Sequence, residues 1–142
     1  MTAAILDTSV LIRLVLDDDS HQSAVAFELV ESATSIIVPT PVFCEFAWVL
    51  QTVKNKAGTK KFTKKMIAQS IREFIEFDYV AIADDEVEAG LKMLEAGGDF
   101  ADGVIEYTGR TLVRNTTTTF FSFDKGAVNK LAKNGLSALL LQ

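Results

Sequence analysis

The sequence contains one cysteine, one histidine and fewer basic than acidic residues, and these shortages restrict the chemistry open to it. Cys44 has no partner for an internal disulfide, and its apolar neighbours favour a small buried hydrophobe. His21 falls in a polar stretch, where we expect a surface residue at the start of a helix. Ser9 has no evident histidine partner for a catalytic triad, and no glycine-rich phosphate loop is present.

Long apolar runs are also missing. No stretch approaches the roughly 18 uninterrupted apolar residues that span a membrane, and the N-terminus lacks the basic segment of a secretory signal. We therefore expect a cytoplasmic protein without membrane contact. A chain of 142 residues, 49% of them hydrophobic, fits one domain, residues 1–142, around one core.

The net charge of -5 argues against a nucleic-acid partner on average, because lysine and arginine drive phosphate binding. The charge is unevenly distributed, however. Residues 54–65, here called the lysine segment, contain six lysines and no acid: Lys54, Lys56, Lys60, Lys61, Lys64 and Lys65. The segment is consistent with RNA contact, with partner contact or with solvated surface.

Hydrophobic periodicity predicts strands that alternate with helices along the whole chain. Thr40 and Pro41 predict the cap and first residue of one of the helices. The expected strands are residues 3–6, 35–38, 79–83, 118–123 and 136–141, and the expected helices are residues 9–16, 21–32, 40–53, a helix beginning at 63, 84–96, 99–113 and 125–133. This order predicts a three-layer α/β/α domain with a mostly parallel central sheet.

Asp7 and Asp124 each follow an apolar strand directly. Because parallel strands end at the same edge of a sheet, where ligands gather, we expect these two carboxylates at that edge. A helix cap is the simpler explanation for Asp7 alone. Glu45 interrupts an apolar helix, and a buried glutamate needs a partner: a distant cation such as Arg13, or a metal.

Asp99 and Asp102 lie three residues apart at a predicted helix start, on one face near the positive end of the helix dipole. A capping box explains Asp99 equally well. Asp102 is the stronger functional candidate, because the helix that follows it is largely apolar.

Carboxylates that converge at one edge repel one another by up to ~4 kcal/mol for each close pair, so a positive charge must hold them together. Oxygen ligands without histidine or cysteine select hard cations such as Mg²⁺ or Mn²⁺. A metal of this kind suits phosphodiester hydrolysis, because it activates a bound water and stabilises charge on the leaving oxygen.

Four stretches, in this order, resemble the PIN-domain ribonucleases, most closely the VapC-type toxins of toxin–antitoxin pairs. They are ILDTSVLI, PTPVFCEFAWVL, GGDFADGVIEYTG and FFSFDKGA. The resemblance covers about the whole chain. It implies Mg²⁺ or Mn²⁺ at the acids, endonucleolytic cleavage of RNA, a homodimer, and inhibition by a cognate antitoxin.

By this resemblance Asp7, Glu45, Asp102 and Asp124 are the catalytic and metal-binding residues, with Asp99 as a fifth acid. Thr8, Ser9 and Ser122 match hydroxyl positions that orient acids or water. Glu106 and Tyr107 depart from the small residues that often occupy the helix after Asp102 in the family.

Other functions remain open from the sequence. A PIN fold that serves only as a binding module would keep the architecture without catalysis. A receiver-type signalling domain would use Asp84 or Asp85 as phosphoacceptor, but it leaves Glu45 unexplained. A haloacid-dehalogenase-like phosphatase needs a second aspartate where this sequence has Ser9.

Overall fold

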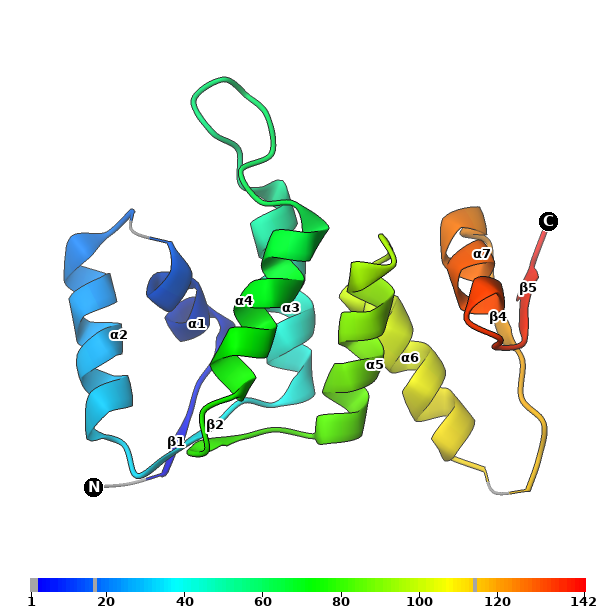
Figure 1. The fold of residues 1–142 in the computed structure, drawn as a ribbon, viewed down its shortest axis with the longest axis horizontal. Coiled ribbons are helices and arrows are strands. Elements are labelled where there is room, and N and C mark those ends of the chain that lie inside the picture. Colours follow the sequence, from blue (N-terminus) through cyan, green and yellow to red (C-terminus); the bar gives the residue numbers. More distant parts are fainter. Residues whose placement is uncertain (1–2, 17, 114) are drawn as a thin grey trace.

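The computed structural model describes residues 3–16, 18–113 and 115–142, and strands and helices alternate along them (Figure 1). The strands are β1 (Ala3–Ile5), β2 (Ser35–Ile37), β3 (Val80–Ala81), β4 (Phe120–Ser122) and β5 (Ala138–Leu140). The helices are α1 (Thr8–Val15), α2 (Ser20–Ser32), α3 (Thr40–Thr52), α4 (Lys64–Ile75), α5 (Asp84–Glu95), α6 (Phe100–Thr111) and α7 (Lys125–Lys133). The predicted α/β alternation is confirmed, with small shifts at the element ends.

The strands form two parallel sheets. In the first, of order β1-β2-β3, Ala3–Ile5 lies opposite Ser35–Ile37, and β2 also pairs with β3. In the second, β4 pairs with β5. The sequence predicts one central sheet, but the described strands form two. β4 pairs with β5, the next strand along the chain after α7, and not with a strand of the first sheet. The two sheets stand apart along the long axis of the molecule, with α3, α5 and α6 between them (Figure 1).

One hydrophobic cluster joins the first sheet to α1, α3, α4, α5 and the start of α6. Leu6, directly after β1, and Ile36 on β2 belong to this cluster. The rings of Phe43 on α3 and Phe100 on α6 lie 6.2 Å apart between centroids. Burial of such side chains supplies most of the folding free energy, at about 25 cal/mol per Å² of apolar surface. The cluster therefore holds the N-terminal halves of α3 and α6 in place, and these halves carry Glu45 and Asp102.

Helices α5 and α6 pack closely because glycine faces the neighbouring helix at two points. A Cβ added at Gly103 would lie 2.4 Å from the carbonyl oxygen of Ala89, and one at Gly90 would lie 2.5 Å from the Phe100 ring. Gly97, with φ of +90°, ends α5 in the left-handed conformation that glycine tolerates. The chain then reverses and begins α6 at the acidic residues.

Helix α3 presents one face to the core and the other to solvent. Phe43, Phe46 and Leu50 are buried, whereas Glu45 is exposed and Trp48 is 62% exposed. Cys44 is only partly buried and packs against the edge of the hydrophobic cluster, so the prediction of a fully buried hydrophobe is corrected to a half-buried one.

The predicted cap of α3 is also wrong. Pro39 is the cap, without a side-chain hydrogen bond, and Thr40 is already the first helical residue and is buried. A buried side chain at this position faces the core and does not reach back to cap the helix.

None of the helices in the described ranges is long and apolar enough to cross a membrane.

Candidate active site

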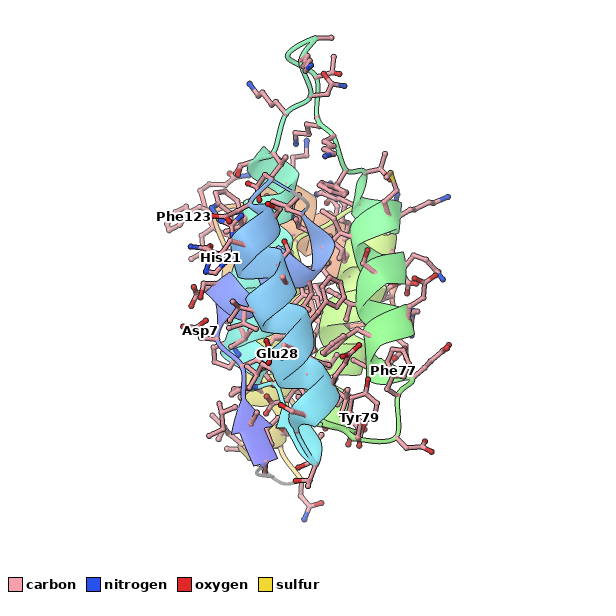
Figure 2. All side chains as sticks on the ribbon, turned by 90° about the vertical axis from the view of Figure 1, so that its left-hand side faces the viewer. Asp7, His21, Glu28, Phe77, Tyr79 and Phe123 are labelled. Atoms are coloured by element: carbon pink, nitrogen blue, oxygen red, sulfur yellow. The ribbon has the colours of Figure 1, made fainter. Side chains whose placement is uncertain are left out.

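Asp7 lies where β1 ends and α1 begins. Its Oδ1 accepts hydrogen bonds from the backbone N–H groups of Ser9 (3.0 Å) and Val10 (3.4 Å) and from the Ser9 hydroxyl (2.6 Å). The Ser9 hydroxyl, followed by the backbone donors, lowers the pKa of Asp7 below its ordinary value. The carboxylate is exposed (Figure 2), so it stays ionised and accessible while it caps the helix.

Glu45 lies on the exposed face of α3 and contacts the start of α1. The Thr8 hydroxyl donates to its Oε2 at 3.2 Å. The expectation that Glu45 is buried is therefore wrong, because the side chain reaches solvent. Of the two partners that the sequence left open, Arg13 pairs with Asp18 instead, and a metal stays a prediction. Asp7, Thr8 and Glu45 form what we call the N-terminal acid group.

Asp102 lies in the first turn of α6, partly buried. Burial raises the pKa of Asp102, and the charges of Asp99 and Asp124 raise it further, whereas Lys64 acts in the opposite direction. Asp99 and Asp124 thus lie within electrostatic range of Asp102, but among the described residues the three acids are not close enough together to hold a metal ion. Asp99, Asp102 and Asp124 form the C-terminal acid group.

Asp99 does not cap α6 through its side chain, although it stands at the cap position. Its Oδ1 lies 3.6 Å from Nζ of Lys64, and the same ammonium donates to the carbonyl oxygen of Gly97 at 2.7 Å. The capping-box explanation of Asp99 is therefore wrong, because the lysine and not the helix N–H groups holds the carboxylate.

Asp124 repeats the arrangement of Asp7 at the end of β4. Its Oδ1 accepts a hydrogen bond from the backbone N–H of Ala127 at 3.2 Å and so caps α7. Its own N–H donates to the Ser122 hydroxyl at 2.9 Å. Of the hydroxyls that the resemblance selects, those of Thr8 and Ser9 thus donate to carboxylates, whereas that of Ser122 accepts from the backbone of Asp124.

The two acid groups are separate in one chain. Asp7 and Asp124 follow strands of different sheets, although parallel pairing predicts them at one edge. Among the residues that the structure describes, no three His, Cys, Asp or Glu side chains lie close enough together to hold a metal ion. The donor chemistry suits a hard cation, but the spacing within one chain does not provide a complete metal site.

The lysine segment projects from the body between α3 and α4 (Figure 1). Lys54 and Lys60 form an antiparallel bridge, and the Asn55 side chain accepts hydrogen bonds from the N–H groups of Ala57 and Thr59 inside the loop. Lys64 and Lys65 lie beyond the loop, in the first turn of α4. The segment thus runs from an exposed loop to the C-terminal acid group, which Lys64 reaches.

Comparison with known families gives a match to the PIN domain over residues 4–126, which include both acid groups. The chain belongs to the PIN domain family. PIN domains are generally nucleases, so this chain has a nuclease-type fold suited to hydrolysis of nucleic acid. The match also agrees with the predicted three-layer α/β/α class. A search of curated proteins found no match.

Two features of this PIN domain were not found by sequence reasoning. The first is the contact of Lys64 with Asp99, which joins residues 35 positions apart and has no local sequence signal. The second is Glu106, which is buried and paired with Arg110 at 3.1 Å. Opposite charges four residues apart in a predicted helix commonly pair, so this spacing could have indicated the ion pair of Glu106 with Arg110.

Proposed function

We propose that this PIN domain is an endoribonuclease that hydrolyses RNA phosphodiester bonds and depends on Mg²⁺ or Mn²⁺. The observation that carries the proposal is the C-terminal acid group, in which Asp102 is partly buried within electrostatic range of two further carboxylates. Keeping like charges together is unfavourable, so natural proteins retain such groups mainly where they bind or catalyse. Asp7 and Glu45 supply two more carboxylates at the end of a parallel strand.

The donor set supports a hard cation. All five acids offer only carboxylate oxygens as ligands, which hard cations such as Mg²⁺ and Mn²⁺ prefer. The described residues of one chain do not bring three donors together. The proposed metal site therefore needs donors in addition to those that one chain places side by side. The chain's own residues prepare it: Ser9 keeps Asp7 ionised, and Thr8 orients Glu45.

The lysine segment supports a polyanionic substrate. Phosphate binding is driven by lysine and arginine, with an affinity that falls steeply with salt. Lys64 lies at the junction between this segment and Asp99, so a backbone bound along the lysines would lead toward the acids. The proposed RNA contacts are Lys54, Lys56, Lys60, Lys61, Lys64 and Lys65.

The test is to incubate the purified protein with total RNA, with Mn²⁺ or with EDTA, and to map the new RNA ends. Cleavage should require the cation and should be lost in Asp7→Asn, because asparagine still caps α1 but carries no charge. The matched control is Asp78→Asn, an exposed aspartate between α4 and β3. Cleavage in EDTA, or cleavage that survives Asp7→Asn, contradicts the proposal.

We also infer that the protein is the toxin of a toxin–antitoxin pair, acts in the cytoplasm and forms a homodimer. An apolar groove of about 580 Å³ between α1, α2, α3 and α4 supports binding of a protein inhibitor. Phe27 lines it, together with Phe77 and Tyr79, whose rings lie 5.4 Å apart (Figure 2). Induced expression should arrest growth and Asp7→Asn should not; equal growth of the two strains contradicts the toxin assignment.

A further inference from the structure

Four strands each have one unpaired edge in the described part of the chain: β1 and β3 at the two sides of the first sheet, and β4 and β5 in the second. β1 pairs with β2 alone, and β4 pairs with β5 alone. Unpaired strand edges expose backbone donors and acceptors that readily pair with another strand. Large apolar side chains on these elements are exposed as well: Ile5 by 72% and Phe121 by 58%.

Of these four edges, those of β1 and β4 match in register, because both strands lead into a helix that an aspartate caps. β1 and β4 are both three residues long, and each ends two residues before an aspartate that caps the following helix. Parallel pairing of Ala3–Ile5 with Phe120–Ser122 therefore sets Asp7 opposite Asp124. Neighbouring strands lie about 4.8 Å apart, so this pairing would join the two acid groups that one chain keeps separate.

Within one chain, β4 is held away from β1. Residues 120–140, here called the C-terminal unit, bury Ala127, Val128 and Leu131, which are not members of the main hydrophobic cluster in the described residues. The unit lies at the far side of α5 and α6 (Figure 1). Its Lys130 side chain lies against the Gly97–Gly98 turn, which leads directly into the start of α6.

A second copy can supply the missing strand without disturbing these contacts. Its β1 can pair with β4 while the C-terminal unit stays beside its own α6. If the exchange is reciprocal, the contact closes into a two-fold dimer, as in domain swapping, and pairs the free edges of both β1 and β4.

We propose that β1 of one chain pairs with β4 of a second copy, so that each site combines Asp7 and Glu45 of one chain with Asp102 and Asp124 of the other. This inference rests on the proposed nuclease function for the use of the site, but not for the existence of the dimer. It also accounts for the absence of a three-ligand group within the described residues of one chain.

Disulfide formation tests the pairing without any assay of activity. In a Cys44→Ser background, Ala4→Cys and Phe121→Cys are prepared as separate single-cysteine proteins, because these positions face each other in the proposed register. Refolded together and oxidised, they should form a mixed disulfide dimer. Ala24→Cys, an exposed alanine on α2, replaces Ala4→Cys as the matched control and should form none.

Complementation tests the composite site. Asp7→Asn and Asp124→Asn proteins should each be inactive alone, whereas co-refolding creates mixed dimers with one intact and one doubly substituted site. Random mixing should restore about one quarter of the wild-type RNA cleavage, since half of the dimers are mixed and half of their sites are intact. Assembly of the site within one chain predicts no recovery.

The outcomes separate this inference from the proposed function. A mixed disulfide between positions 4 and 121 supports the exchange even if the wild-type protein cleaves no RNA. Absence of the mixed disulfide overturns the exchange, and so does a cross-link confined to single chains of an Ala4→Cys, Phe121→Cys double variant. An active wild-type protein without complementation also overturns it.

Discussion

The close packing of α5 on α6 predicts opposite effects for two glycine substitutions in the same helix. Gly103→Ala places a Cβ 2.4 Å from the Ala89 carbonyl oxygen and 2.8 Å from the Met93 Cβ. The oxygen is backbone and cannot turn aside, so the helices must separate. Gly109→Ala meets no atom within 4 Å.

The difference between these variants isolates the steric clash, because both exchange glycine for alanine in α6. Without a clash, replacement of glycine by alanine should stabilise the fold by roughly 0.4–1 kcal/mol, because it lowers the conformational entropy of the unfolded chain. We expect this effect for Gly109→Ala. Overpacking typically costs about 1–3 kcal/mol, so Gly103→Ala should be less stable than Gly109→Ala by about that amount.

Urea denaturation followed by circular dichroism measures both free energies of unfolding. Because Gly103 is next to Asp102, separation of the helices should also reduce RNA cleavage in Gly103→Ala and not in Gly109→Ala. Equal stability of the two variants would refute the inference that this contact positions α6 and its carboxylate.

Three further predictions concern the charges of the two acid groups. Lys64→Met should raise the pKa of Asp102 further, because the Lys64 ammonium lowers that pKa. The control Lys65→Met removes an exposed neighbouring charge and should leave the pKa of Asp102 unchanged. NMR titration of the carboxyl groups measures both, and equal values in the two variants would contradict the prediction. The raised pKa of Asp102 means that the folded state retains a proton which the unfolded state loses above about 3.8, so the free energy of unfolding falls as pH rises through this window. Asp102→Asn should remove that part of the pH dependence in urea titrations without metal, and an unchanged profile contradicts it. Ser9→Ala should raise the pKa of Asp7 toward its ordinary value, because the hydroxyl is the largest cause of its lowering; no change in the NMR titration would contradict this.

The sequence predicts local structure well where the signal lies within one element. The apolar stripe of Ile67 and Ile71 defines α4, and Thr63 caps it through a hydrogen bond to the N–H of Met66 at 3.1 Å. Asp7 and Asp124 were both expected at strand ends, and both lie there as helix caps. These features depend on neighbours within a few residues, so periodicity and capping rules describe them.

Features that depend on distant contacts were not predictable in the same way. Glu45 follows an apolar sequence, yet the packing of Phe43 and Phe46 into the core turns it to solvent. The contact of Lys64 with Asp99 depends on how α4 meets the α5–α6 turn. The division of the strands between two sheets likewise depends on whether β4 pairs with β5 alone or with β1 as well, which no local pattern specifies.

Binding of Mn²⁺, counted by electron paramagnetic resonance, tests the central claim that Asp7 and Asp124 belong to one functional site. The wild-type protein and Asp78→Asn should bind the ion equally, whereas Asp7→Asn and Asp124→Asn should each weaken binding to a similar extent. Binding that neither substitution affects would contradict the account.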